Sequence, residues 1–511
     1  MPSKKTKEIW EFGDFQTPDE LARSAIQIIK NLDFKPRSIL EPTCGRGAFL
    51  FSAVDTFPKA ELTIGVDINK AHLNHLKKRI FKEYRKTQIK ILNADFFALD
   101  WSEILKDLPK PILIIGNPPW VTSSELGILQ SSNLPEKSNF QSRAGLEAIT
   151  GKSNFDISEW MLLKHLEWLQ KQRGMVAMLC KMTVARKVLA YAWKHDYPLR
   201  LARLYKINAM KHFNASVDAG FFLMDCGQET GSKDCDIYEK VSDSKPSHTI
   251  GYHDGIVISD VDLYEKWKFL RGTDKAYMWR SGIKHDCARV MELKRSQTGF
   301  FNGFGEFIQL ENKYVYPLFK SSDIGNGRIR ECRKFALVTQ RYIGEDTTHI
   351  KKNAPKTWEY LQSNMESFEK RASSIYRNRP PFSIFGVGDY TFAPWKIAIS
   401  GFYKKLNFKP IGPIEGRPAI FDDTIYFLPA WSEGEAYFLS EILNSKPAQE
   451  FFSSMIFWSD KRPITIDLLK RLNIRVLTQK LGRENEYNSY ATIRSAKHSV
   501  QDQLQQTLFA G

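Results

Sequence analysis

The sequence has few cysteines, no long apolar run and no excess of acidic residues. Its six cysteines are scattered without a Cys-x-x-Cys pair, so neither a disulfide framework nor a zinc site is expected. No apolar stretch approaches the roughly 18 residues that span a membrane, and the basic segment 1–10 lacks the apolar core of a secretory signal. These absences favour a protein of the reducing cytoplasm that has no membrane anchor.

The composition is that of a folded protein with a basic surface. Hydrophobic residues make up 42% of the chain and charged residues 26%, which is typical of globular rather than disordered proteins. A length of 511 residues exceeds one ordinary core, so two or three domains are expected. The formal net charge of +16 favours a polyanionic partner, although an unspecialised basic surface would give the same value.

The N-terminal third alternates short apolar strands with helical patterns. The predicted strands are residues 38–41, 62–68, 89–95, 111–116 and 174–180, and the predicted helices are residues 18–32, 47–56, 69–86 and 157–170. This alternation predicts an α/β fold with a doubly wound, Rossmann-like parallel sheet. Ligands of such sheets bind at the carboxyl ends of the strands, where the first four strands all carry polar residues.

A glycine-containing turn follows the first strand. In the segment Glu41–Phe49, Gly45 and Gly47 let the backbone turn tightly and approach a ligand closely. Leu50 stands where the dinucleotide fingerprint needs a third glycine, so NAD is disfavoured, and the Gly-Lys-Ser/Thr of a P-loop is absent. Alone, this pattern indicates a turn and nothing more.

The next two strands end near acidic residues. Asp67 follows the glycine turn by about 20 residues, where a carboxylate can bind a ribose diol, and Asp95 can accept a hydrogen bond from an adenine amine. Each acid alone is more often a helix cap or a solvated loop residue. Together, on successive strands, they suit an adenosine-containing ligand.

The fourth strand runs into the segment Asn117-Pro118-Pro119-Trp120. The Asn117 side-chain oxygen and the Pro118 carbonyl can both accept hydrogen bonds from one NH2 group, and Trp120 offers a face for stacking on a base. An aromatic amine is a poor nucleophile because its lone pair is delocalised into the ring. Two acceptors would localise that lone pair on nitrogen, so positioning would suffice without a strong base or a metal. The alternative is a proline-rich loop that only caps a strand.

These motifs, in this order, resemble the gamma class of amino-group DNA methyltransferases over residues 12 to about 225. The resemblance implies S-adenosylmethionine as methyl donor and the N6 amine of adenine as acceptor. The implied cofactor contacts are Thr17 and Glu41 at the methionine part, Gly45 and Gly47 in the glycine motif, Asp67 at the ribose, and Asp95 with Phe96 at the adenine.

The same resemblance assigns the catalytic motif. Asn117 to Trp120 match its NPPY/F/W pattern, and Phe213, in the segment His212–Ala219, is implied to sandwich the flipped base together with Trp120. A core aromatic is the alternative for Phe213. Cys44 stands where the family has Ala or Gly, and it is not read as a nucleophile. The Pro-Cys dipeptide of cytosine-C5 methyltransferases is absent.

Two regions carry weaker signals. Residues 121–154 lack a clear period, so they either act at the active site or DNA backbone or have no function. The composition between Gly227 and Pro246 predicts a boundary, which gives a methyltransferase domain at 1–235 and an α+β target recognition domain at 236–511. Segments 316–324 and 457–465 resemble parts of such domains. Basic and aromatic residues interleave at residues 371–379, 395–396, 402–405 and 458–462, which favours a surface that binds duplex DNA.

The sequence thus predicts a site-specific DNA adenine-N6 methyltransferase, the modification arm of a bacterial or archaeal restriction–modification system with a separately encoded endonuclease. A fused nuclease and methyltransferase, an RNA or protein-glutamine N-methyltransferase, and a catalytically silent DNA-binding module remain as alternatives. For the fused nuclease, Glu292-Leu-Lys294 and Glu311-Asn-Lys313 match half of a nuclease motif without the other half, and both are expected to be ordinary surface residues.

Overall fold

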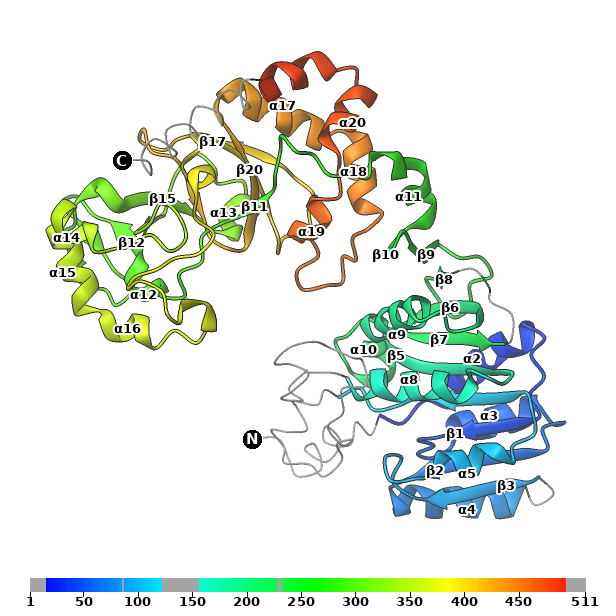
Figure 1. The fold of residues 1–511 in the computed structure, drawn as a ribbon. Coiled ribbons are helices and arrows are strands. Elements are labelled where there is room, and N and C mark those ends of the chain that lie inside the picture. The colour runs from blue at the N-terminus through cyan, green and yellow to red at the C-terminus, as the bar shows by residue number, and fades with distance from the viewer. Residues whose placement is uncertain (1–14, 85–86, 122–155, 228–230, 232, 493–511) are drawn as a thin grey trace. The chain divides into compact units, whose positions relative to one another are not determined.

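The computed structural model describes residues 15–84, 87–121, 156–227, 231 and 233–492, which fall into two compact units, Met1–Asp262 and Leu263–Gly511 (Figure 1). Residues 12–14 of the N-terminal motif and residues 122–154 of the aperiodic segment lie outside the described residues. Each unit has its own sheets and its own buried core.

A ten-stranded sheet forms the first unit. Its spatial order is β10 (Ile256–Ile258), β9 (His248–His253), β8 (Asp234–Tyr238), β6 (Leu199–Ile207), β7 (Ala219–Cys226), β5 (Gly174–Lys181), β4 (Ile112–Gly116), β1 (Ser38–Glu41), β2 (Leu62–Asp67) and β3 (Ile89–Asn93). Strands β5, β4, β1, β2 and β3 pair in parallel, whereas β7 runs antiparallel to both β5 and β6. The strand order reverses beside β1, which confirms the doubly wound α/β fold and places the expected ligand site between the carboxyl ends of β1 and β4.

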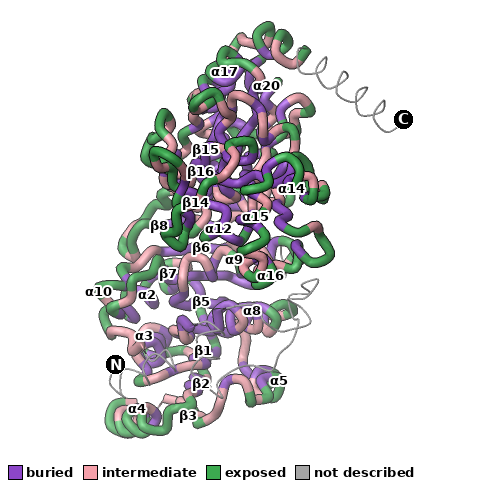
Figure 2. The backbone as a smooth tube through the Cα atoms, turned by 90° about the vertical axis from the view of Figure 1, so that its left-hand side faces the viewer, coloured by how far each residue is buried: buried purple, intermediate pink, exposed green. Residues whose placement is uncertain are grey.

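Helices cover both faces of this sheet. They are α2 (Asp19–Asn31), α3 (Ala48–Thr56), α4 (Lys70–Glu83), α5 (Trp101–Lys106), α8 (Ile157–Leu169), α9 (Met182–Lys194) and α10 (Ala209–Phe213). The division between the units falls within the next helix, α11 (Val261–Trp267). Figure 2 shows α2 and α3 on one side of β1 and β5, and α8 and α9 on the other. Alternate strand residues such as Ile39 and Leu113 pack with Ile26 and Phe49 of the first pair of helices. Strands buried on both faces explain the continuous apolar runs in the sequence.

The first unit ends later than the composition predicts. The predicted boundary at residues 235 and 236 falls inside β8, which pairs in parallel with β6 and antiparallel with β9. The division lies after Asp262 because β8, β9 and β10 extend the first sheet. Among the described residues of this polar stretch, 239–247 form turns and bends between β8 and β9, so their composition marks a loop within the unit.

The second unit mixes short strands and helices, in agreement with the predicted α+β class. One sheet has the order β11 (Arg280–Ser281), β20 (Ile425–Ala430), β17 (Trp395–Ser400) and β18 (Lys409–Ile411). The other has the order β14 (Phe307–Ile308), β13 (Phe300–Phe301), β12 (Glu292–Arg295), β16 (Lys334–Leu337), β15 (Val315–Phe319) and β19 (Ile420–Phe421). The helices are α12 (Ala288–Met291), α13 (Ser321–Gly325), α14 (His349–Asn353), α15 (Pro355–Ser363), α16 (Met365–Glu369), α17 (Glu433–Leu443), α18 (Lys446–Ser453), α19 (Ile466–Leu469) and α20 (Ile474–Lys480).

Candidate active site

A cleft of about 720 Å³ lies at the carboxyl ends of β1, β2, β3 and β4. It brings together most of the predicted site residues, namely Thr17, Glu41, Gly45, Asp67, Asp95, Phe96, Asn117 and Pro119. Gly47, Pro118, Trp120 and Phe213 are not part of its lining. The parallel sheet therefore gathers, at one edge, side chains that are spread over about a hundred residues of sequence.

The glycine turn is held closed from two sides. The Gly45 N–H donates to Asp67 Oδ2 at 2.7 Å, and the Arg46 N–H donates to Gln16 Oε1 at 3.0 Å. Gly45 has a φ of +50°, and a Cβ atom there would lie 2.8 Å from Gln16 Oε1. Only glycine fits this turn without displacing Gln16. The segment before α2 is thereby fastened to the loop that forms one wall of the cleft.

The acidic residues at the ends of β2 and β3 both bind backbone N–H groups and line the cleft. Asp67 Oδ1 accepts from the Asn69 N–H at 2.7 Å, so both carboxylate oxygens of Asp67 bind backbone in the structure. Asp67 also lines the cleft, so its carboxylate lies within the site that a ligand would occupy. Asp95 Oδ1 accepts from the Phe97 N–H at 2.9 Å, and Asp95 also faces the cleft. The acids thus shape the backbone of the cleft and still offer acceptors to a ligand.

Phe96 gives the cleft an apolar wall. Its ring is buried and lies 5.0 Å from the Trp101 ring and 5.9 Å from the Trp168 ring, measured between centroids. His165 joins this cluster, and burial lowers the pKa of its imidazole to about 3. This aromatic cluster keeps the wall rigid and dry, which suits a planar heterocycle beside Asp95.

Glu41 is a buried carboxyl group with an unused acceptor. Only 3% of the residue is exposed, and its Oε2 atom has no hydrogen-bond partner among the described residues. Burial raises the pKa of this carboxyl well above its ordinary value, and the nearby Asp67 charge raises it further. A buried acceptor of this kind is satisfied best by a cationic ligand group.

Asn117 carries the second unused acceptor of the cleft. Its Nδ2 atom donates to the Phe15 carbonyl at 3.1 Å, and this bond fixes the direction of the side-chain amide. The Oδ1 atom is buried and has no partner within the part of the chain that the structure describes. The Thr43 hydroxyl donates to the Asn117 carbonyl at 3.4 Å and holds the backbone in place. The site therefore presents one pre-oriented acceptor for an incoming N–H donor.

Trp120 and Phe213 lie against each other next to this point. Their ring centroids are 5.2 Å apart with an interplanar angle of 70°, and the Trp120 Nε1–H donates to the Leu179 carbonyl at 3.3 Å. Phe15 contacts Phe213 edge-on at 6.4 Å. Sequence analysis predicts that Trp120 and Phe213 sandwich a base, and the structure does bring these two rings together. Because they touch edge to face, a base enters between them only if the rings move apart.

Comparisons with known proteins place the chain in a family. Residues 4–186, which include the whole cleft, match the family model described as N-6 DNA Methylase. A relative from Nostoc sp., Type II methyltransferase M.NspV, is 46% identical over 479 residues, which cover 93% of this chain and 98% of the relative. The chain belongs to the Type II methyltransferase family. It is a DNA adenine methyltransferase that uses S-adenosylmethionine.

More distant similarities cover less sequence. Modification methylase CviBIII of Paramecium bursaria Chlorella virus NC1A is 32% identical over 119 residues, which cover 23% of this methyltransferase and 27% of the relative. Among solved structures, the Type IIL restriction-modification enzyme MmeI in complex with DNA has a TM-score of 0.48 at 14% identity. That match covers 89% of this chain and 64% of MmeI.

Sequence analysis of the methyltransferase missed several residues of the cleft. The Phe15 carbonyl, Gln16 and Thr43 hold Asn117 and the glycine turn, and Asn69 caps α4 by accepting from the Ala71 N–H at 3.0 Å. Asn69 could have been found, because an Asn before a helical pattern indicates an N-cap. The Phe15 carbonyl could not, since a backbone acceptor has no signature in the residue type.

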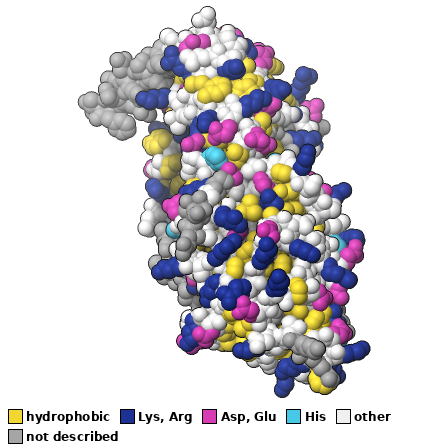
Figure 3. Space-filling model, turned by 90° about the vertical axis from the view of Figure 1, so that its right-hand side faces the viewer, with side chains coloured by type: hydrophobic (Ala, Val, Ile, Leu, Met, Phe, Trp, Pro, Cys, Tyr) yellow, Lys and Arg dark blue, Asp and Glu magenta, His cyan; other side chains and the backbone are white. Residues whose placement is uncertain are grey.

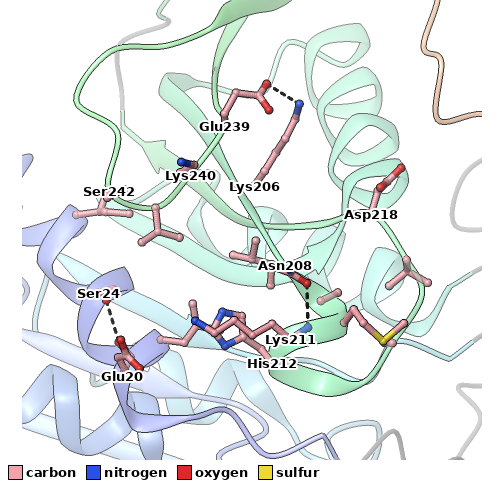
Figure 4. A pocket seen from close by; sticks show the side chains of 18 of the residues that line it. Glu20, Ser24, Lys206, Asn208, Lys211, His212, Asp218, Glu239, Lys240 and Ser242 are labelled. Carbon is pink, nitrogen blue, oxygen red and sulfur yellow. Dashed lines mark hydrogen bonds and ion pairs between the residues drawn. The ribbon is translucent and has the colours of Figure 1, made fainter.

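A second hollow of the methyltransferase unit, of about 1160 Å³, adjoins α10 (Figure 4). Its walls carry both polar and apolar side chains. Among the polar ones, Lys206 pairs with Glu239 at 2.6 Å, and Asn208 Oδ1 accepts from the Lys211 N–H at 2.9 Å. Sequence analysis gives no indication of this hollow. Residues Ala209 to His212 of the short helix α10 line it, whereas the candidate base-stacking residues Trp120 and Phe213 do not.

The basic and aromatic clusters of the second unit are partly structural. Lys396, predicted on the DNA-binding surface, is 1% exposed, and its Nζ donates to the Ala393 carbonyl at 2.7 Å, so the prediction is wrong for this residue. Its place on the central strand β17 turns it into the core. Arg462 lies over Phe402 at 5.2 Å, which joins two of the predicted clusters.

The lysines of both nuclease half-motifs, Lys294 and Lys313, are exposed as expected, whereas the two glutamates have structural roles. Glu292 is buried and forms ion pairs with Lys320 and Lys334. Glu311 accepts from the Lys356 and Thr357 N–H groups at 2.9 and 2.8 Å and so caps α15. Along β12, Glu292 and Leu293 are both buried whereas Lys294 and Arg295 are both exposed, so no alternation in the sequence indicates that Glu292 is buried.

The positive charge of the chain is carried by Lys and Arg side chains on its surface. Lys and Arg side chains are spread over the face drawn in Figure 3, with apolar side chains between them. This matches the net charge of +16 and the need to neutralise phosphates. None of the described helices is long and apolar enough to cross a membrane.

Proposed function

We propose that the chain transfers the methyl group of S-adenosylmethionine to N6 of an adenine flipped out of duplex DNA, as the gamma-class modification enzyme of a restriction–modification system. One observation supports this most strongly. Glu41 Oε2 and Asn117 Oδ1 are buried acceptors without partners among the described residues, and both residues line the same cleft. The first suits the cationic methionine part of the donor and the second suits the amine of the acceptor.

The residues of the cleft fit the donor along its length. Glu41, with Thr17, would hold the methionine ammonium, and a cation there would satisfy the buried carboxyl. Asp67 would bind the ribose diol, and Asp95 would accept from the adenine amine beside the Phe96 wall. The turn at Gly45 brings the backbone close to the ligand. When bound, S-adenosylmethionine supplies an electrophilic methyl group on a sulfonium.

The chain's own contribution to methyl transfer is placement of the amine. Asn117 Oδ1 and the Pro118 carbonyl would each accept one N6–H, which localises the nitrogen lone pair and directs it into the cleft. Phe15 fixes the orientation of the Asn117 amide, so no reorganisation is needed during the reaction. No strong base is needed before transfer, because the proton can leave the alkylated nitrogen for water afterwards.

The target base must leave the duplex to reach this point. Trp120 and Phe213 would separate to stack on the adenine, which offsets part of the unstacking energy by roughly 1–3 kcal/mol per stacked ring. The first unit, Met1–Asp262, would form the methyltransferase domain and the second unit, Leu263–Gly511, a target recognition domain. A separately encoded endonuclease would share the recognition sequence, and both proteins would act in the cytoplasm.

Transfer of a radiolabelled methyl group tests this function in vitro. The purified chain is given labelled S-adenosylmethionine with duplex DNA, structured RNA or a glutamine peptide, and the Asn117→Ala variant serves as the control. Label in N6-methyladenine of DNA, dependent on Asn117, is the expected result. Label in RNA or peptide alone would refute the proposal in favour of that substrate. Cofactor binding without label in any substrate would indicate a silent DNA-binding module.

A further inference from the structure

A hairpin at the edge of the six-stranded sheet exposes three phenylalanines. Strands β13 and β14 are joined by residues 302–306, and Phe301, Phe304 and Phe307 are 40, 45 and 47% exposed. Single exposed apolar residues are ordinary, whereas three large ones on one short hairpin indicate a contact surface. The hairpin belongs to the second unit and takes no part in the cleft described above.

The hairpin is built to hold these rings in place. Phe301 and Phe307 are direct partners across the two strands, with ring centroids 5.6 Å apart at 65°. Asn302 is buried, and its Oδ1 accepts from the N–H groups of Phe304 and Glu306, both at 3.0 Å. The Gly303 N–H donates to the Arg289 carbonyl at 2.7 Å. The rings therefore project from a fixed turn, and little conformational freedom is lost when they bind.

Cationic side chains flank the rings. The Arg289 guanidinium lies 5.7 Å from the Phe304 ring centroid, and Lys294 is the direct cross-strand partner of Phe301. Both cations are exposed, and within the described part of the chain neither forms an ion pair with an acidic residue. Flat apolar rings beside unpaired cations complement a polymer of stacked bases and phosphates. A purely apolar partner would leave both cations uncompensated.

We propose that the hairpin formed by Phe301, Phe304 and Phe307 is a DNA-contacting wedge whose rings stack on bases of the substrate duplex. Arg289 and Lys294 neutralise the flanking phosphates. The inference rests on the proposed function in that DNA is the substrate, and it adds a contact outside the catalytic cleft. Stacking requires the bases next to the rings to open or kink, as apolar wedges do at base steps.

Fluorescence anisotropy with duplex DNA tests the wedge. Affinity is measured for the full chain, for Phe304→Ala and Phe304→Trp, and for Phe269→Ala. Phe269 is a matched control in the same unit because it is 50% exposed. Removal of one base stack should weaken binding roughly 5- to 150-fold, whereas Phe304→Trp should retain affinity and Phe269→Ala should not change it. Lys294→Gln should reduce the slope of log affinity against log salt by about 1.

The outcomes separate this inference from the proposed function. Absence of methylated adenine with the wild-type chain would refute the proposed function. The DNA affinity of the hairpin variants could still be measured, because the binding assay does not depend on methyl transfer. Equal affinity of Phe304→Ala and the wild-type chain, both shown folded by thermal unfolding, overturns the wedge. Sedimentation of the proteins without DNA tests whether the hairpin instead binds a second copy of the chain. If Phe304→Ala instead dissociates a dimer without changing DNA affinity, the hairpin binds a second copy and the wedge is refuted.

Discussion

Replacement of Asn117 by Ala removes the acceptor that we propose orients the target amine. Its Oδ1 is buried and unpartnered among the described residues, so the contact with the amine forms in a site shielded from water. A single pre-oriented polar contact in such a site is worth about 2.7–4 kcal/mol of the barrier, which corresponds to roughly 10²–10³ in kcat. Asn117→Ala should therefore lower kcat by that factor. Binding of S-adenosylmethionine should change little, because Asn117 is assigned to the amine and not to the donor.

The Asp variant probes the same contact more sharply. Asn117 Nδ2 donates to the Phe15 carbonyl at 3.1 Å, and Asn117→Asp puts an oxygen in that place. An ionised Asp would set two acceptors against each other, whereas a protonated Asp can donate to Phe15 and still accept from the amine. The activity of Asn117→Asp relative to the wild-type chain should thus increase as the pH falls below neutral.

Single-turnover methyl transfer and calorimetric cofactor titration measure the two effects separately. A wild-type methylation rate in Asn117→Ala would refute the assignment of Asn117 to the amine. A loss of activity that follows from a loss of cofactor affinity would do the same, and it would place Asn117 at the donor. A pH profile of Asn117→Asp that parallels the wild-type profile would show that the bond to Phe15 does not orient the side chain.

The remaining predictions concern the donor, stability and DNA. Asp67→Ala should weaken cofactor binding about 10- to 100-fold, since a hydrogen bond to a charged acceptor is worth about 1.5–3 kcal/mol. The kcat at saturating cofactor should change little. Unchanged cofactor affinity in calorimetry would exclude the ribose contact. Burial raises the pKa of Glu41, so a cationic ligand should drive out its proton on binding, and calorimetry in two buffers should show proton release that Glu41→Gln abolishes. Burial lowers the pKa of Lys396 to about 7 from an ordinary 10.5, so the unfolded chain binds more protons between these values. The free energy of unfolding of the wild-type chain should rise with pH through that window, by up to roughly 5 kcal/mol, and urea unfolding of Lys396→Met should lose this rise. DNA affinity should fall steeply with salt in anisotropy titrations, and a flat response would contradict phosphate neutralisation.

Much of the first unit could be predicted because its strands are buried on both faces. Such strands appear as uninterrupted apolar runs, and the predicted segments 38–41 and 174–180 agree with β1 and β5 to within one residue at each end. The second unit has strands as short as Phe300–Phe301, which show no period. The pairing of Leu318 with Ile420 joins residues far apart in sequence, and no local pattern indicates it.

The site shows the same division between local and distant causes. Acidic residues and Asn117 at strand ends could be predicted, because a parallel sheet must bring those ends together. The bond from Asn117 to Phe15 could not, since it depends on how the N-terminal segment crosses the glycine turn. Nor could the edge-to-face contact of Trp120 with Phe213, which is set by packing beneath α2 and α3.

The central claim is that this chain methylates adenine at N6 in DNA. Single-molecule sequencing of genomic DNA from a methylation-free bacterial host that expresses the chain tests it most directly, with Asn117→Ala expressed in parallel. The account predicts N6-methyladenine at one defined sequence motif with the wild-type chain, and little or none with the variant. Unmodified DNA in cells that contain folded, cofactor-bound protein would contradict it.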